Sequence, residues 1–313
     1  MPDYLKLNYM LALIFLFGCS AEYIPPKDII RKEYTAPRLH GSSVALADGE
    51  TLYAVNTIID SDQPIIVGIH GLGGNANDFY YFINYARQNN ISFFAVDLRG
   101  FGHWRNNRGD LTSLKLWIKD IEDVVQAMRK MYPHRKIILM GESLGASVIY
   151  WYCSENKNMQ DILPDGLISM SIVTRPGSRI KFRNILEGTI GYFFYPKKSI
   201  TIEGLSKQFM EDPENSEFIK NNPLKLNKVS FRFLLQARHI IDHTPDYISQ
   251  LHIPLLVFQG GQDTLSQSDD VMKIVERMKV KEFIYMEECT HSLLTGKCRD
   301  SIFSRIKDWV YDF

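Results

Sequence analysis

The sequence lacks several features that would point to particular classes of protein. It contains no C-x-x-C pair, and its eight histidines do not cluster with its four cysteines, so a structural zinc site is not expected. Its acidic and basic residues balance at a formal net charge of zero, without a stripe of lysine and arginine, which argues against nucleic acid as a partner. No solenoid-period repeat or low-complexity tract is present. Its 313 residues allow one large globular domain, or a core with an insertion.

The apolar run near the N-terminus is too short to cross a membrane. It covers residues 9–18, whereas a spanning helix needs about 20 apolar residues. A run of this length fits the central region of an export signal. It ends in Leu-Phe-Gly-Cys-Ser at residues 16–20, which resembles a bacterial lipobox, where the cysteine is lipidated and becomes the mature N-terminus. The sequence therefore predicts a lipoprotein-type signal peptide at residues 1–18, lipidation of Cys19, and a Pro-containing tether at residues 19–40.

Lipidation at this position would determine where the protein resides. Several acyl chains on Cys19 would hold it on a membrane, because each buried CH₂ contributes about 0.8 kcal/mol. This predicts a membrane-anchored lipoprotein of the bacterial cell envelope, with the periplasmic face of the outer membrane as one location. An ordinary cleaved signal and an uncleaved anchor are the alternatives. Cys289 and Cys298 could form a disulfide if the compartment is oxidising, and two reduced thiols are the alternative.

Beyond residue 40, apolar strands alternate with amphipathic helices. Runs rich in β-branched and aromatic residues predict strands at 64–70, 91–96 and 136–140, and the clearest helical periodicity covers residues 111–131. Such an alternation favours an α/β fold with a mostly parallel sheet that helices cover on both faces. Ligands bind beyond the carboxyl ends of the strands in sheets of this kind.

The alternation divides the chain into a core and an insertion. The first part of the core is predicted at residues 41–173 and ends with a strand at 166–173. Residues 174–250 lack the alternation and are predicted to form an inserted, mostly helical lid. The second part of the core covers residues 251–313. It is predicted to contain strands at 253–259 and 281–286 and helices at 268–278 and 300–311.

Gly141–Gly145 reads Gly-Glu-Ser-Leu-Gly between a strand and a helix-compatible stretch. That context is typical of a nucleophile elbow, in which a strained turn presents the serine at the end of the sheet. Side chains would collide in so tight a turn, which explains the two glycines. Ser143 would then lie at the N-terminus of a helix, where the Leu144 N–H can donate to a developing oxyanion. A connecting Gly-Ser loop is the alternative.

A nucleophilic serine needs a base, and the base needs an acid that orients it. Asp263 follows the strand at 253–259, and His291 follows the strand at 281–286, in the chain order of a Ser-Asp-His triad. Rival candidates fail on position: Asp269 and Asp270 fall at a helix start and Asp242 and Asp246 lie in the predicted lid. His239, His243 and His252 do not follow a core strand at the right point. We therefore predict Ser143, Asp263 and His291 as the catalytic residues.

His70–Gly73 follows the first long strand of the predicted sheet. The Leu72 N–H is expected to point inward as a second oxyanion donor, and such a donor is typically worth about 10²–10³ in rate. Gly71 and Gly73 would allow the loop to approach the nucleophile closely. His70 is expected to brace the loop through a hydrogen bond.

These motifs together resemble the α/β-hydrolase superfamily, specifically its monoacylglycerol lipase and lysophospholipase-like branch, the serine aminopeptidase family. The resemblance covers about residues 45–310. It depends on five segments: His70–Gly73, Asp97–Gly102, Gly141–Gly145, Gly261–Asp263 and Thr290–Ser292. The resemblance implies the α/β-hydrolase fold, triad roles for the three residues above, and no metal or organic cofactor. Glu142 departs from the branch, where histidine is frequent.

We therefore expect a serine hydrolase that cleaves carboxylic acyl esters, of monoacylglycerol or lysophospholipid type. Its partners would be a lipid ester substrate and a membrane, contacted through the lipidated N-terminus. One alternative is an aminopeptidase, in which lid carboxylates such as Glu211, Asp212 or Glu214 would bind a substrate ammonium group. The other is a non-catalytic envelope lipoprotein that keeps the fold for binding.

Overall fold

A computed structural model describes residues 38–40, 42–174, 194–202, 222–266, 268–279 and 282–313. All of them belong to one compact unit, Thr35–Phe313. The predicted signal peptide, almost all of the tether and the carboxylates at positions 211–214 lie outside the described residues. Among the described residues, no helix combines the length and the apolar character needed to cross a membrane.

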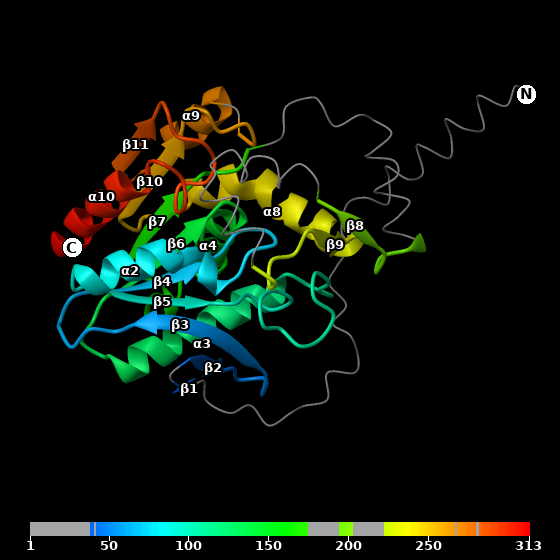
Figure 1. Cartoon of the computed structure of the whole chain (residues 1–313), viewed down its shortest axis with the longest axis horizontal. Coiled ribbons are helices and arrows are strands. Elements are labelled where there is room, and N and C mark those ends of the chain that lie inside the picture. The colour runs from blue at the N-terminus through cyan, green and yellow to red at the C-terminus, as the bar shows by residue number, and fades with distance from the viewer. Residues whose placement is uncertain (1–37, 41, 175–193, 203–221, 267, 280–281) are drawn as a thin grey trace, which may run out of the picture. The chain divides into compact units, whose positions relative to one another are not determined.

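A nine-stranded sheet forms the centre of the unit, with the strand order β1-β2-β3-β5-β4-β6-β7-β10-β11 (Figure 1). Its strands are β1 (Arg38–His40), β2 (Ser43–Ala45), β3 (Thr51–Thr57), β4 (Ile65–Ile69), β5 (Ser92–Val96), β6 (Ile137–Glu142), β7 (Gly166–Met170), β10 (Leu255–Gly260) and β11 (Glu282–Met286). The first three strands pair antiparallel, β3 pairs antiparallel with β5, and every pair from β5 to β11 is parallel. The mostly parallel sheet predicted from the sequence is therefore present.

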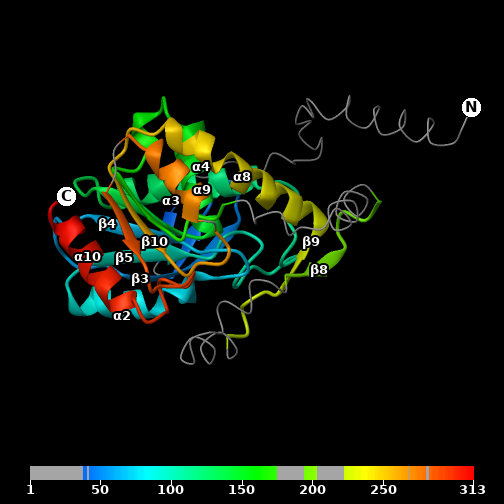
Figure 2. The ribbon, with the colours of Figure 1, turned by 90° about the horizontal axis from the view of Figure 1, so that it is seen from above.

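Helices cover both faces of this sheet (Figure 2). One face carries α3 (Lys115–Met131), α4 (Leu144–Glu155), α8 (Phe231–Ser249) and α9 (Ser268–Glu276), and the other carries α2 (Tyr80–Gln88) and α10 (Arg299–Tyr311). The strand residues alternate between the two layers, as Ile66 packs with the second group and Val67 with the first. This two-sided burial explains why β4, β5, β6 and β7 are buried along their whole length.

Two predicted elements have different ends in the structure. The helix expected over 111–131 begins at Lys115, and the Ser113 hydroxyl accepts a hydrogen bond from the Lys115 N–H at 3.2 Å. Residues 111–114 precede the helix and are hydrogen-bonded to Gln236 of α8. The Gln236 side chain accepts from the Leu114 N–H and donates to the Leu111 carbonyl. The strand expected over 166–173 ends at Met170, because Ser171 has a φ of 56° and cannot continue it.

The predicted insertion, residues 174–250, contains both helix and strand among its described residues. Helix α8 begins after Ser230, whose hydroxyl accepts from the Phe233 N–H at 3.2 Å. Two short strands that the sequence did not predict, β8 (Ser199–Thr201) and β9 (Lys228–Ser230), pair antiparallel beside its start (Figure 1). Two 3₁₀ turns, η1 (Ala76–Phe79) and η2 (Gln160–Ile162), complete the elements of the described residues.

Candidate active site

The turn after β6 has the geometry of a nucleophile elbow. Ser143 connects β6 directly to α4, with φ 56° and ψ −120°, a combination that only a strained turn imposes on a serine. A Cβ on Gly141 would lie 2.6 Å from the Ala146 nitrogen, and one on Gly145 would lie 2.2 Å from the Ile69 carbonyl oxygen. Any side chain at either position would therefore force this turn to open.

Leu144 is the first residue of α4. The first amides of a helix have no partner within the helix and carry the positive end of its dipole. The carbonyl of Ser143 accepts hydrogen bonds from the Ala146 N–H at 3.0 Å and the Ser147 N–H at 3.4 Å, so the helix begins directly after the serine. Both features favour negative charge beside the serine, which is 5% exposed.

The loop after β4 lies against this serine. A Cβ built on Gly71 would be 3.2 Å from Ser143 Cβ and 3.8 Å from its Oγ, so a side chain there would crowd the serine. Leu72, the predicted second donor, follows directly. Gly73 has a φ of 75°, and a Cβ there would lie 2.3 Å from the Leu226 carbonyl oxygen. The loop is thus packed between the elbow and the insertion.

His70 connects this loop to the end of β5. Its Nε2 accepts from the Leu98 N–H at 2.9 Å, so its Nδ1 carries the proton and donates to the Gly71 carbonyl at 2.8 Å. Burial lowers the pKa of this imidazole and keeps it neutral. The predicted hydrogen bond of His70 to the loop is therefore present.

Asp97 supports the neighbouring segments, a role that was not predicted from the sequence. One of its oxygens accepts from the Ala76 N–H at 2.7 Å, and the other accepts from the backbone N–H and Nδ1 of His103 at 2.7 and 2.8 Å. Gly102, at φ 54°, leaves room for it, because a Cβ there would meet the carboxylate at 2.1 Å. The Asp-Leu-Arg-Gly-x-Gly motif places this segment after a predicted strand, but it does not indicate which atoms Asp97 binds.

Asp263 and His291 lie side by side after β10 and β11. His291 Nδ1 is 2.8 Å from Asp263 Oδ2, and His291 is fully buried. The carboxylate also accepts from Gln259 Nε2 at 2.9 Å and from the Leu265 N–H at 2.8 Å. The Ser171 hydroxyl donates to the His291 carbonyl at 2.6 Å. These contacts fix the carboxylate and the imidazole in one orientation.

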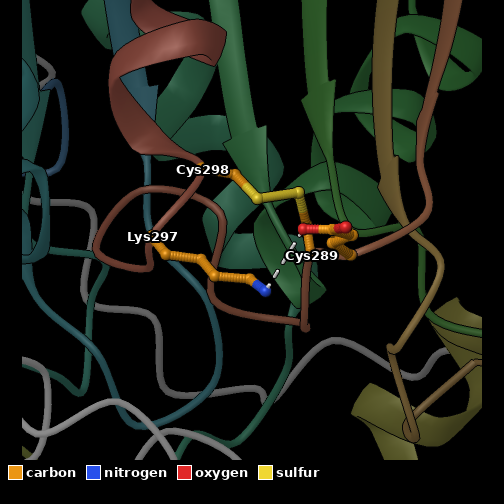
Figure 3. Close-up of a disulfide and its surroundings, with 4 residues drawn as sticks. Cys289, Lys297 and Cys298 are labelled. Carbon is orange, nitrogen blue, oxygen red and sulfur yellow. Dashed lines mark ion pairs between the residues drawn. A yellow bond between two sulfur atoms is a disulfide. The ribbon is translucent and has the colours of Figure 1, made fainter.

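The two loops that carry this pair are packed backbone to backbone. Cβ atoms on Gly260 and Gly261 would lie 2.4 Å from the carbonyl of Thr290 and 2.6 Å from that of Glu287. A disulfide joins Cys289 to Cys298, with the two Cα atoms 6.0 Å apart, and so closes the loop that contains His291 (Figure 3). Of the two alternatives for these cysteines, the structure has the bonded one.

All the predicted site segments converge at one edge of the sheet. The predicted oxyanion loop follows β4, Ser143 follows β6, and Asp263 and His291 follow β10 and β11, which are all parallel strands. The carboxyl ends of parallel strands meet at the same edge, where ligands bind in such sheets. Only Cys19, of the predicted site residues, lies outside the described residues. No cluster of three or more metal-binding side chains is found in the described part of the chain.

Glu142 is a further titratable group of this site. It is the last residue of β6 and 7% exposed. Burial raises the pKa of its carboxyl to about 7, and the negative charge of Asp78 adds to this rise. The charges of His291 and Lys225 and the N–H of Leu294 act in the opposite direction. The sequence could not predict this environment, since it depends on three other loops.

Comparison with known proteins adds the following findings. Residues 60–297 match the family model described as serine aminopeptidase, S33. A putative monoglyceride lipase of Schizosaccharomyces pombe is 22% identical over 83% of this chain and 71% of its own length. Phospholipase YtpA of Bacillus subtilis is 25% identical over 68% of this chain and 82% of its own. The crystal structure of a soluble variant of monoglyceride lipase from Saccharomyces cerevisiae in complex with a substrate analog superposes with a TM-score of 0.72. It is 17% identical and covers 91% of this chain and 97% of that one.

Proposed function

The chain belongs to the serine aminopeptidase S33 family of α/β-hydrolases, and on that premise we propose that Ser143 is the nucleophile of its carboxylic ester hydrolysis. The observation that carries the proposal is the alignment of Asp263 with His291. A carboxylate 2.8 Å from Nδ1 keeps the proton on that nitrogen, which makes Nε2 the basic nitrogen of the ring.

Each step of the reaction follows from this arrangement. His291 Nε2 takes the hydroxyl proton as Ser143 Oγ attacks the ester carbonyl, and the N–H groups of Leu72 and Leu144 donate to the oxyanion. His291 then gives the proton to the departing alcohol, leaving an acyl-enzyme. Water repeats the sequence, with His291 as base, and releases the carboxylic acid. Asp263 stays ionised throughout and stabilises the imidazolium.

We propose an acyl ester of monoacylglycerol or lysophospholipid type as the substrate. This substrate class is supported by the names of the relatives, which include monoglyceride lipases and a phospholipase. An aminopeptidase is the second candidate, because the matching family model carries that description. The acids that would bind an ammonium group in an aminopeptidase, Glu211, Asp212 or Glu214, lie outside the described residues.

The proposal is tested with a fluorophosphonate probe, which forms a bond only with an activated serine. We expect the purified wild-type protein to be labelled and the Ser143→Ala variant not to be. Ser147→Ala is a matched control, since Ser147 is a fully buried serine one turn further along α4, and it should still be labelled. Absence of labelling in folded wild-type protein would refute the nucleophile. A panel of monoacylglycerols, lysophospholipids and aminoacyl amides then separates the two candidate substrates.

We also propose that the protein is a lipoprotein of the bacterial cell envelope, anchored through Cys19. The lipobox-like segment supports this, and so does the disulfide, because such bonds persist mainly in oxidising compartments. Expression of the full chain in a bacterium should give a membrane-bound, acylated product. Cys19→Ser should abolish acylation and release the protein from the membrane, and an acylated Cys19→Ser product would refute the assignment.

A further inference from the structure

The insertion contacts the predicted oxyanion loop, His70–Gly73, directly through its backbone. The Leu226 N–H donates to the Gly73 carbonyl at 2.9 Å. A Cβ on Gly73 would lie 2.3 Å from the Leu226 carbonyl oxygen, so the two backbones pass each other without room for a side chain. Leu72, whose N–H is the predicted oxyanion donor, directly precedes Gly73. The contact with Leu226 therefore acts on the part of the loop that carries this donor.

The carboxylate of Asp78 lies against the end of the same loop. Asp78 is 7% exposed, and a Cβ on Gly74, the residue after the loop, would lie 2.2 Å from its Oδ2. That oxygen also accepts from the Asn75 N–H at 3.2 Å. The carboxylate thus holds the chain where the loop enters η1. A carboxylate removed from water in this way is costly unless it is paired.

Lys225 of the insertion supplies the opposite charge. Its Nζ lies 3.7 Å from Asp78 Oδ2, and the two side chains are only 18% and 10% exposed. Solvent and salt therefore screen this pair less than a pair on the surface. Because Lys225 directly precedes Leu226, two successive residues of the insertion are bound to the loop, one through its side chain and one through its backbone.

A tight turn at residues 222–225 fixes Lys225 in this place. The Asn222 side chain accepts from the Leu224 N–H at 3.0 Å, and the Asn222 carbonyl accepts from the Lys225 N–H at 3.2 Å. On another side, the Arg108 guanidinium, from the segment between β5 and α3, donates to the Leu224 carbonyl. The turn is held by its own hydrogen bonds and by the core, so it can serve as a fixed support for the oxyanion loop.

We propose that Lys225 is a positioning residue, which holds the oxyanion loop through its ion pair with Asp78 so that the Leu72 N–H can donate to the oxyanion. This rests on the proposed function. Lys225 transfers no proton, and its effect reaches the reaction only through the loop. The insertion is then part of the catalytic geometry, because it supplies one half of the ion pair that supports a transition-state donor.

The decisive variant is Lys225→Met, which removes the charge and keeps an unbranched apolar chain. We expect kcat for a chromogenic acyl ester to fall about tenfold, a part of the roughly 10²–10³ that one oxyanion donor contributes. KM should stay within about twofold, because the oxyanion forms only in the transition state. Lys225→Arg keeps the charge and should restore most of the lost kcat. If kcat in Lys225→Met equals that of the wild type, the proposal is overturned.

A trifluoromethyl ketone gives a readout that a general loss of stability would not move. Ser143 Oγ adds to its carbonyl carbon, the serine proton passes to His291, and the carbonyl oxygen becomes an oxyanion in the place where the transition state has one. We expect the Ki of this inhibitor to rise in Lys225→Met by the same factor by which kcat/KM falls. An unchanged Ki would show that the oxyanion donors are still in place and would overturn the proposal.

Lys228→Met is the matched control, since Lys228 is an exposed lysine three residues further along the insertion, at the start of β9. Its kcat and Ki should match the wild type. Asp78→Asn, which keeps an oxygen for the Asn75 N–H, should lower kcat as Lys225→Met does. The variant with both substitutions should lose no more than the larger of the two single losses, because either one already breaks the pair. Losses that multiply would show that the two side chains act separately, which would contradict the proposal.

Two further results separate the possible failures. A wild type that neither hydrolyses esters nor reacts with the fluorophosphonate refutes the proposed function itself, whereas an active wild type with an unchanged Lys225→Met refutes only the role of Lys225. If Lys225→Met loses the native circular dichroism spectrum, Asp78→Asn alone serves instead, with the same changes expected in kcat and Ki. Wild-type values of both in that variant would overturn the proposal.

Discussion

Cys289 and Cys298 are joined across the loop that carries His291, two residues beyond the first of them. The histidine of a triad must keep its ring within hydrogen-bonding reach of two partners, and a covalent closure restricts the motion of its loop. In the same loop, the Cys289 carbonyl accepts a hydrogen bond from the Gln262 N–H at 2.9 Å. The disulfide therefore connects the stability of the protein to the geometry of its proposed base.

Removal of this disulfide should reduce stability and activity together. For a loop this short, the Cys289→Ser/Cys298→Ser variant should lose about 2–3 kcal/mol of unfolding free energy. Denaturant unfolding and kcat are the measurements, with reductant as a second route to the same state. Reductant should leave the double variant unchanged, because the remaining described cysteine, Cys153, is buried and unbonded. If the double variant were as stable as the wild type, the disulfide would not contribute to the stability of the fold.

Asp263→Asn should leave the fold intact and remove most of the activity. An amide cannot hold the proton on His291 Nδ1, and loss of that tautomer in a triad costs about 10³–10⁴ in kcat. Single-turnover hydrolysis of a chromogenic ester measures the effect. Asp269→Asn is the matched control, since Asp269 lies exposed in the first turn of α9 and should retain full activity. A loss of less than tenfold in Asp263→Asn would argue against this acid.

Arg99→Met should be among the most destabilising single substitutions in the core. Arg99 donates two hydrogen bonds to Asp120, at 2.7 and 3.0 Å, and a third to Asp48 at 2.7 Å. Burial raises the pKa of Asp120 to about 6, although Arg99 opposes that rise. Without the guanidinium, a nearly inaccessible carboxylate is left uncompensated, at a cost of about 3–5 kcal/mol.

Chemical denaturation at pH 7.5 measures this cost. The control is Lys119→Met, which removes an exposed i,i+3 partner of Glu122 and should change stability by no more than about 0.5 kcal/mol. A similar small change for Arg99→Met would show that Asp120 is accommodated without its partner.

The parts of the molecule that the sequence predicted well are those in which local pattern and burial agree. Apolar runs buried on both faces could only be central parallel strands, and the ends of β4, β6, β10 and β11 determined where the predicted site residues meet. Order along the chain then sufficed to pair Asp263 with His291. Strands β8 and β9 were missed because three-residue strands carry no periodicity.

Contacts between loops could not be read from the sequence. Asp97 bonds to Ala76 and His103, and Glu142 bonds to Leu294, through backbone positions that depend on how each loop leaves its strand. The start of α3 was misplaced for the same reason, because Leu114 continues the helical periodicity while its N–H is bound to Gln236. A sequence indicates which residues reach one edge of the sheet, but not the hydrogen bonds that hold them there.

Glu142→Gln should make the protein more stable at alkaline pH. The pKa of this carboxyl is raised to about 7 in the folded protein, above its ordinary value of 4.5. The folded state therefore binds the proton more tightly than the unfolded state, and stability falls as the pH rises from about 4.5 to about 7. Above that range the ionised carboxylate costs on the order of 3 kcal/mol, which glutamine avoids. Thermal unfolding should thus show the variant with the higher Tm at pH 8 and with the same Tm at pH 4.5. A variant less stable at pH 8 than the wild type would contradict this prediction, because it would show that the ionised carboxylate stabilises the fold.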